Sequence, residues 1–455
     1  MVRRIISVTG LAAFFMLLVL SCSKKGNTPP PPPPPPPPSP TIPACVSNIS
    51  PANGELIRNG FGVSFVWAAS AGATGYDLYI GTSAATATVV ASNITTTSYV
   101  FSVAATFNIT YYWYVVPKNA NGSATGCATN ATSFTPVYIQ SPPGLGYLVV
   151  GYFPSYRNPA DVPDIKFRMT NVVNYAFFEV TGTGGLNVVS PSTLFAVITK
   201  ARANNAKVFV SINDGSGDGK TNFKNMAATQ IGRTAFAADV MNKVRLYGLD
   251  GVDIDWEFPT TSDGTDITFT ALIKELSDSL HRDARYYLTA AITAGKYAGG
   301  IRDAIRNEIF SYVDWFNIMA YDDFSTSTPY RHHSDYTLAT VCLNYWLTTR
   351  AMPSAKVVLG LPAYGRPSGI TQTGTILTYK TILSQGGNPQ LDSAIVTAGG
   401  FTNYTIYYNG QYTVKRKAIL AKQTAGGVMM WEKWQDAVDN NSLLKAACDT
   451  VGRLY

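Results

Sequence analysis

The sequence has few histidine, cysteine and charged residues. Of its 455 residues, 3 are His and 5 are Cys, and Asp, Glu, Lys and Arg together make up 14%. Zinc clusters and Ser-His-Asp catalysis therefore have few possible participants. The net charge of +7 falls to 31 − 28 = +3 once the four basic residues of the first 25 positions are set aside. No dense basic stripe remains, so nucleic acid is not an expected partner, and acidic side chains must carry any chemistry.

Residues 1–22 indicate an export signal. Arg3 and Arg4 precede an apolar run from Leu11 to Leu20, which is too short to cross a bilayer as a helix. The stretch from Val19 to Cys22 resembles the lipobox of bacterial lipoproteins, in which the cysteine becomes the acylated first residue. We therefore expect an exported protein, lipidated at Cys22 and anchored to a bacterial membrane, with the outer membrane favoured. A secreted protein without an anchor is the alternative.

Residues 23–43 form a proline-rich linker. It contains an unbroken run of ten prolines, Pro29 to Pro38, which predicts an extended polyproline helix rising about 3.1 Å per residue. Such a helix is a stiff spacer. A ligand for a proline-binding domain is the alternative interpretation.

Residues 44–140 have the composition of a small all-β domain. Only four residues between positions 45 and 137 are charged. Short runs of alternating apolar side chains are separated by turn-forming residues, which predicts a β-sandwich. The region resembles the fibronectin type III domains of exported bacterial carbohydrate-active enzymes. The runs are Val63–Trp67, Tyr76–Ile80, Thr97–Phe101 and Thr110–Val116.

The aromatic residues of this region have a structural interpretation. We expect Trp67, Tyr79, Tyr112 and Trp113 to pack in the core and across strands rather than to form a sugar-stacking platform. The reason is that one face of each strand must bury its aromatic side chains.

The cysteines also have structural interpretations. Cys45 and Cys127 lie near the two ends of the β domain, and we expect them to form a disulfide in an oxidising compartment. Cys342 and Cys448 lie in helical patterns further along the chain, and we expect buried free thiols there.

Beyond a second short linker at residues 141–144, residues 147–455 alternate strand-like and helical segments. Helical patterns such as Ile231–Tyr247, Phe269–Asp283 and Leu338–Ala351 separate eight apolar runs. This order predicts an α/β fold, a TIM (β/α)8 barrel whose chemistry lies at the carboxyl ends of its strands. A doubly wound open sheet is the alternative, but no glycine-rich phosphate loop follows the first run. The runs are Leu148–Phe153, Asn171–Phe178, Lys207–Ile212, Gly251–Asp255, Tyr287–Ile292, Trp315–Ala320, Lys356–Leu361 and Gly427–Trp431.

The fourth run carries three alternating acids. In a strand, Asp253, Asp255 and Glu257 point to one face, which we expect to be the barrel interior. Like charges in a low-dielectric interior disfavour each other's ionisation and raise the pKa of an acid that donates a proton. A solvated acidic loop and a site for a divalent cation are the alternatives. We expect general-acid chemistry without a metal or cofactor.

At these acids the chain resembles a known family. Asp250, Asp253, Asp255 and Glu257 fill the D-x-x-D-x-D-x-E signature of family 18 glycoside hydrolases, the chitinases and their relatives, and the resemblance extends over residues 147–455. Further matching segments end other strands. They are Gly151-Tyr152-Phe153, Tyr175-Ala176-Phe177, Phe316-Asn317-Ile318-Met319-Ala320-Tyr321-Asp322, Gly360-Leu361-Pro362-Ala363-Tyr364-Gly365-Arg366 and Gly427-Val428-Met429-Met430-Trp431.

The resemblance implies hydrolysis of β-1,4 bonds between N-acetylglucosamine units, as in chitin, with a nucleophile supplied by the 2-acetamido group of the sugar. Glu257 would be the acid and then the base, Asp255 would orient the acetamido group, and Asp253 would hold or share a proton with Asp255. Tyr321 would donate to the acetamido oxygen, and Asp250 would have a structural role. The residues implied in substrate binding are Tyr152, Phe177, Met319, Asp322, Tyr364, Arg366 and Trp431.

Two alternative functions stay open: an endo-β-N-acetylglucosaminidase acting on N-glycans, and a surface protein that only binds chitin. We expect a monomer in either case. The family's S-x-G-G segment here reads from Ser211 to Gly215, with Asn213 and Asp214 in place of the glycines, which changes backbone freedom and polarity near the sugar-binding face. Between Arg366 and a helix at Lys415–Lys422, strand character at Phe401–Val414 indicates a small α+β insertion.

Overall fold

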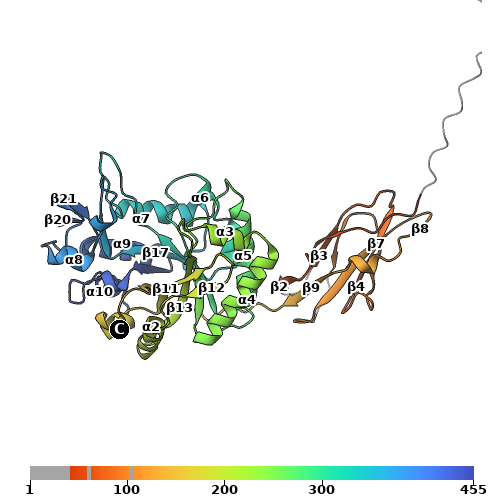
Figure 1. The fold of residues 1–455 in the computed structure, drawn as a ribbon, viewed down its shortest axis with the longest axis horizontal. Coiled ribbons are helices and arrows are strands. Elements are labelled where there is room, and N and C mark those ends of the chain that lie inside the picture. Colours follow the sequence, from red (N-terminus) through yellow and green to blue (C-terminus); the bar gives the residue numbers. More distant parts are fainter. Residues whose placement is uncertain (1–40, 59–62, 102–105) are drawn as a thin grey trace, which may run out of the picture.

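The computed structural model describes residues 41–58, 63–101 and 106–455 (Figure 1). The predicted signal segment, the lipidation at Cys22 and the proline run lie outside the described residues. Within the described ranges, we find no helix with both the length and the apolar character needed to cross a membrane.

The N-terminal region consists of two sheets that share one core. Phe65, Trp67 and Trp113 are buried between them. The predicted sandwich is thus confirmed as an architecture, and its fibronectin type III identity stays a prediction. One sheet has the order β1 (Asn48–Ser50), β3 (Val63–Trp67), β6 (Ser98–Phe101); the other has the order β2 (Glu55–Arg58), β9 (Thr132–Val137), β7 (Tyr111–Asn119), β4 (Gly75–Gly81), β5 (Thr88–Ile94), with β8 (Gly122–Ser123) paired to β7.

The aromatic prediction is correct for three of the four residues. Trp67 and Trp113 are 1% and 0% exposed, and Tyr79 stacks across the strands on Tyr114 with 4.8 Å between ring centroids. The prediction is wrong for Tyr112, which is 37% exposed. Tyr112 and Trp113 are neighbours on β7, so only one of them can face the core.

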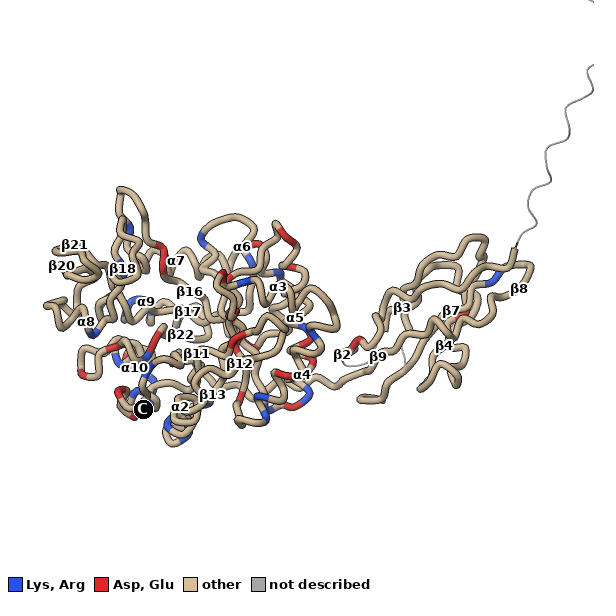
Figure 2. Tube along the Cα trace, viewed as in Figure 1, with Lys and Arg blue, Asp and Glu red and all other residues tan. Residues whose placement is uncertain are grey.

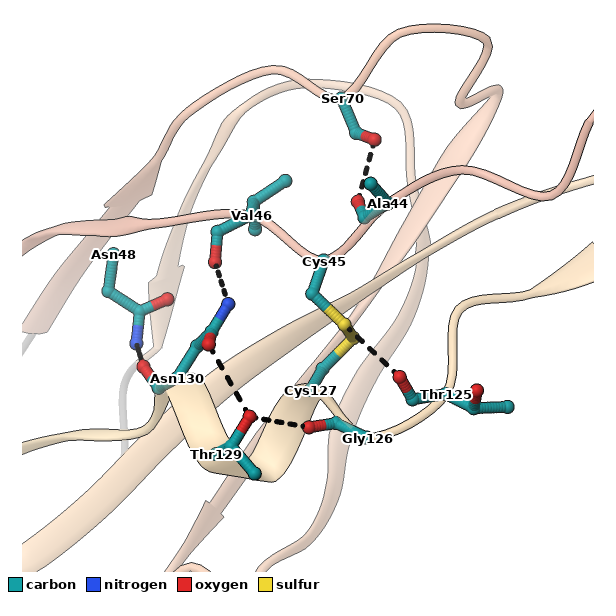
Figure 3. The surroundings of a disulfide bond; sticks show 10 residues. All are labelled: Ala44, Cys45, Val46, Asn48, Ser70, Thr125, Gly126, Cys127, Thr129 and Asn130. Atoms are coloured by element: carbon teal, nitrogen blue, oxygen red, sulfur yellow. Dashed lines mark hydrogen bonds between the residues drawn. A yellow bond between two sulfur atoms is a disulfide. The ribbon is translucent and has the colours of Figure 1, made fainter.

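The predicted disulfide is present. Cys45 and Cys127 are bonded with 5.3 Å between their Cα atoms, and Figure 3 shows that the bond joins the start of the N-terminal region to the short helix Cys127–Asn130. The bond ties the two ends of the region together over a sequence separation of 82 residues. Cys342 and Cys448 are buried free cysteines, as predicted.

Eight parallel strands close into a barrel, because β10 pairs with both β11 and β22. All eight predicted runs form these strands, and a short antiparallel strand β12 (Leu186–Val188) pairs with β11. The barrel strands are β10 (Leu148–Pro154), β11 (Val172–Val180), β13 (Lys207–Asp214), β14 (Gly251–Ile254), β15 (Tyr287–Thr293), β16 (Trp315–Met319), β17 (Val357–Pro362) and β22 (Gly427–Trp431).

Helices surround the barrel (Figure 1). In the longest, α4, the residue before the helix is Thr229, whose side chain caps it by accepting a hydrogen bond from Gly232 N–H. The helix ends before Gly248, whose φ of 62° suits glycine. The helices are α1 (Asp164–Arg168), α2 (Pro191–Ala203), α3 (Thr221–Ala227), α4 (Gln230–Tyr247), α5 (Thr265–Leu280), α6 (Gly300–Asp303), α7 (Tyr336–Leu343, continued by a π-helical turn at Asn344–Thr349), α8 (Tyr379–Ser384), α9 (Gln411–Thr424) and α10 (Leu443–Val451). Short 3-10 turns lie at Pro159–Asp161, Asn307–Ser311, Ser354–Lys356, Thr373–Thr375 and Lys433–Gln435.

The predicted insertion lies between β17 and α9 and contains a small antiparallel sheet. The prediction of strand character up to Val414 is wrong, because helix α9 already begins at Gln411. Val414, Lys417, Ala418 and Ala421 bury one face of that helix at spacings of three and four residues. The sheet has the order β19 (Leu377–Thr378), β18 (Tyr364–Pro367), β21 (Phe401–Tyr407), β20 (Ser393–Ala398).

The N-terminal sheets contact the barrel at helix α5. The guanidinium of Arg58, at the end of β2, lies 2.6 Å from the carboxylate of Asp278, which is almost fully buried. Lys274 Nζ also reaches the Leu56 carbonyl at 3.2 Å, and Gln140 N–H donates to the His281 carbonyl at 2.8 Å. Figure 2 shows that few charged residues lie on the N-terminal sheets, and a large part of these few lies at the contact with helix α5.

Candidate active site

The carboxyl ends of the barrel strands open into a cavity of about 890 Å³. Nearly every strand contributes a side chain to its wall, which is where the barrel fold places binding and chemistry. Nine of the predicted residues line it: Tyr152, Phe177, Asp255, Glu257, Met319, Tyr321, Asp322, Tyr364 and Trp431. The two others, Asp253 and Arg366, lie directly behind this wall and contact its members.

The acids in and directly after β14 alternate with side chains that face the helices. Trp256 stacks on Phe223 of α3 with 5.0 Å between ring centroids and meets Phe269 of α5 edge-on. The acids on either side of Trp256 therefore face the barrel mouth, as the spacing predicts. The strand itself ends at Ile254, so Asp255 and Glu257 follow its last residue.

Asp253 is fully buried and accepts four hydrogen bonds from neutral donors. Burial raises the pKa of Asp253, and the four hydrogen bonds oppose that rise. Among the described hydrogen bonds, none joins Asp253 to Asp255, so the predicted shared proton has no support in this geometry. Both carboxylate oxygens are already occupied by the surrounding donors. These donors are the Tyr152 hydroxyl (2.7 Å), the Ser211 hydroxyl (2.7 Å), the Thr289 hydroxyl (2.6 Å) and the Asn317 amide (3.0 Å).

Asp255 lies two residues after Asp253, nearer to the carboxyl end of the barrel. Its N–H donates to the Ile212 carbonyl at 2.8 Å, whereas its buried Oδ1 has no hydrogen-bond partner among the described residues. Burial, followed by the charges of Glu257 and Asp253, raises the pKa of Asp255 well above its usual value. An unpaired carboxylate oxygen at the cavity wall is available to a ligand that brings a donor.

Glu257 is the acid that is open to the cavity. Desolvation and the negative charge of Asp322 raise its pKa. A carboxyl group that keeps its proton to higher pH, and that a ligand can reach, is suited to act as a general acid.

Asp322 is fixed by three neighbours. It accepts from the Tyr364 hydroxyl at 2.7 Å, and it lies 3.2 Å from the Arg366 guanidinium and 3.6 Å from Nδ1 of His333. Burial alone would raise the pKa of Asp322, but these contacts lower it below its usual value. Its φ of 62° is uncommon for a residue other than glycine, and the contacts hold the backbone there.

His333 is a residue of the site that sequence reasoning missed. Its ring is completely buried and lies 5.1 Å from the Tyr364 ring. The sequence shows only a polar segment around His332 and His333, and nothing in its pattern indicates that one of the two rings faces Asp322. Thr289, which donates to Asp253, was missed in the same way. Asn317 and Ser211 lie in segments that match the family, but their contacts with Asp253 were not predicted.

Aromatic rings form an apolar floor. Trp431 ends β22 and is stacked on Phe177 with 5.7 Å between centroids and 22° between planes. The Tyr152 ring centroid also lies 5.4 Å from that of Trp431. The site therefore combines flat apolar surface with acids above it, an arrangement that suits a pyranose ring with polar edges.

Asp250 does not reach the cavity. Its Oδ2 accepts from the Val208 N–H at 2.9 Å, and Lys207 Nζ lies 3.1 Å from its Oδ1. These contacts fix the start of β14 against β13, which confirms the structural role that its odd spacing predicts.

The family model described as "Glycosyl hydrolases family 18" matches residues 148–436. The chain belongs to this family. It is 27% identical over 259 residues to Chitotriosidase-1 of Mus musculus, covering 47% of this chain and 55% of the mouse protein, so it spans about half of that relative.

Two solved structures share the fold. The GH18 chitinase from the chitin utilization locus of Flavobacterium johnsoniae has a TM-score of 0.56 and 28% identity, covering 67% of this chain and 94% of that one. A mutant plant class V chitinase from Cycas revoluta in complex with (GlcNAc)3 has a TM-score of 0.57 and 25% identity, covering 67% of this chain and 99% of that one. Both similarities confirm the predicted barrel.

Proposed function

We propose that this protein hydrolyses β-1,4 bonds between N-acetylglucosamine units of chitin or its oligomers, with the substrate's acetamido group as the nucleophile. The observation that carries the proposal is the buried Asp255 oxygen, which has no hydrogen-bond partner among the described residues, in a cavity that Glu257 and Trp431 also line. Chitinase relatives, one of them holding (GlcNAc)3, support the choice of substrate.

In the proposed mechanism, Glu257 donates its proton to the glycosidic oxygen as the bond to the anomeric carbon breaks. The acetamido oxygen attacks that carbon and forms an oxazolinium ion. Glu257, now a carboxylate, takes a proton from the water that opens the oxazolinium and restores the acetamido group. The raised pKa of Glu257 keeps the proton available for the first step.

Asp255 and Tyr321 are placed to hold the acetamido group. The free Oδ1 of Asp255 would accept from its N–H, and the developing positive charge would be stabilised by the carboxylate. Within the described part of the chain, the Tyr321 hydroxyl has one weak contact, with Met429 Sδ at 3.9 Å, so it can turn to donate to the acetamido oxygen. Asp253 would hold a proton beside this pair, because burial raises its pKa and the four donors offset only part of that rise.

The proposal requires an acetylated substrate. We expect a fluorogenic chitotriose to be cleaved at least about 100-fold faster than its deacetylated counterpart, because the latter lacks the internal nucleophile. Product release is measured for both under one set of conditions. Equal rates would refute the mechanism. Cleavage of high-mannose glycopeptide in preference to chitotriose would instead favour an N-glycan substrate, and binding without cleavage would favour a binding protein.

A second test concerns pH. The negative charge of Asp322 raises the pKa of Glu257, and activity is lost as pH rises through that pKa because the acid loses its proton. We therefore expect Asp322→Asn to lower the pKa of Glu257 and to move the basic limb of the kcat profile to lower pH. Tyr364→Phe is the matched control, since it removes a contact of Asp322 but keeps the charge. A basic limb that stays in place in Asp322→Asn contradicts this coupling.

A further inference from the structure

Asn213 occupies the cavity wall beside the acids. Strand β13 pairs in parallel with β14, with Ser211 opposite Asp253 and Ile212 opposite Ile254. Ser211 points inward, since its hydroxyl donates to Asp253. Asn213 is two residues further on the same strand, so it shares the inward face and lies at the level of Asp255. It lines the cavity together with Phe177 on one side and Asp255 on the other.

The amide of Asn213 lacks a partner for its oxygen. Oδ1 is buried, and it accepts no hydrogen bond from any of the described residues. A buried acceptor without a donor is unfavourable, and native structures satisfy nearly all such groups. Because β11 and β14 cover the two flanks of β13, the cavity is the side from which a donor reaches the carboxamide once the side chain turns.

The backbone that carries Asn213 is held by the hydrogen bonds of the next residue. The next residue, Asp214, is 7% exposed. Its carboxylate accepts from the N–H groups of Ser216 and Phe223, each at 2.7 Å. The carboxamide is therefore presented from an anchored position rather than from a free loop, which reduces the entropy lost when a ligand binds.

From this geometry we propose that Asn213 is a specificity-determining residue that accepts a hydrogen bond from a hydroxyl or acetamido N–H of the sugar chain above Trp431. The inference rests on the proposed function, because it takes the ligand to be an N-acetylglucosamine oligomer. A neutral amide suits this ligand, which carries donors but no charge. An amide also adds no negative charge beside Asp255 and Glu257, whereas a carboxylate at position 213 would disfavour their ionisation further.

The test uses the full chain with Glu257→Gln, so that oligomers bind without being cleaved. We expect Asn213→Ala in this background to weaken the binding of chitotetraose by about threefold to tenfold in calorimetric titration, which is the range for one lost neutral hydrogen bond. In the catalytically competent chain, the same substitution is expected to raise KM by a similar factor and to change kcat by less than about twofold, because the contact is made in the bound ground state as well.

Asn187→Ala is the matched control. Asn187 lies on β12 and is exposed outside the cavity, with its amide directed to Glu179 at 3.3 Å, and its substitution is expected to leave the affinity unchanged. Asn213→Ser serves as a second variant should Asn213→Ala fail to fold, and thermal unfolding checks both. Affinities equal to that of the control overturn the inference alone. If the original chain cleaves no chitotetraose and the Glu257→Gln chain does not bind it, the proposed function falls, and the inference with it.

Discussion

Replacing Glu257 with glutamine is expected to lower kcat on chito-oligosaccharides by a factor of about 10² to 10⁴, the usual contribution of a general acid. Glutamine has nearly the same volume, so the Trp431 floor and the fixed Asp322 stay in place. Binding of chitotetraose should therefore remain within about threefold of the original affinity. Single-turnover cleavage and calorimetric titration measure the two effects separately.

Glu308→Gln is the control for this substitution. The Glu308 side chain is 51% exposed at the surface and is paired with Arg306, so its loss should leave kcat unchanged. Turnover retained in Glu257→Gln would show that another group supplies the proton. Loss of binding together with turnover would show that Glu257 mainly holds the ligand.

The second large effect is expected for Asp255→Asn. This substitution removes the carboxylate that stabilises the oxazolinium ion, and removal of one such electrostatic contact lowers kcat by about 10² to 10³. The NH2 group of the asparagine also cannot accept a hydrogen bond from the acetamido N–H. Product release from the fluorogenic chitotriose gives kcat, and the protein's thermal midpoint shows whether the fold has been disturbed.

Asp164→Asn is a suitable comparison, because that side chain is 64% exposed on α1, far from the acids in the sequence. If Asp255→Asn lowered the rates on acetylated and deacetylated substrates by the same factor, Asp255 would not act through the acetamido group. The assignment of its role would then be wrong, even if the enzyme remained a chitinase.

The barrel could be predicted from the sequence because its strands are buried on both faces. Runs such as Val149–Phe153 or Val428–Trp431 have no polar face to confuse with a surface strand. The period of two also predicted that Asp253, Asp255 and Glu257 share a face. These are local properties, and each can be seen within about ten residues of sequence.

The surroundings of the acids could not be predicted in the same way. The four donors to Asp253 come from four other strands, and the donor Tyr152 lies 101 positions away in the chain. Sequence reasoning therefore predicted that Asp253 holds or shares a proton with Asp255, but it could not identify the neutral donors that surround its oxygens. Likewise Tyr364 and Arg366 were predicted to bind the substrate, which stays a prediction, and the sequence could not show that both also hold Asp322.

The contact between β2 and α5 affects how the molecule responds to mechanical load. The chain passes between its two parts at residues 141–144, and the ion pair of Arg58 with the buried Asp278 and the hydrogen bond of Lys274 to the Leu56 carbonyl attach the parts at helix α5 as well. With these additional attachments, the joint cannot rotate freely about the peptide linker. A pull applied near residue 41 is thus transmitted as torque to helix α5, and bending requires the Asp278 carboxylate to lose its guanidinium partner.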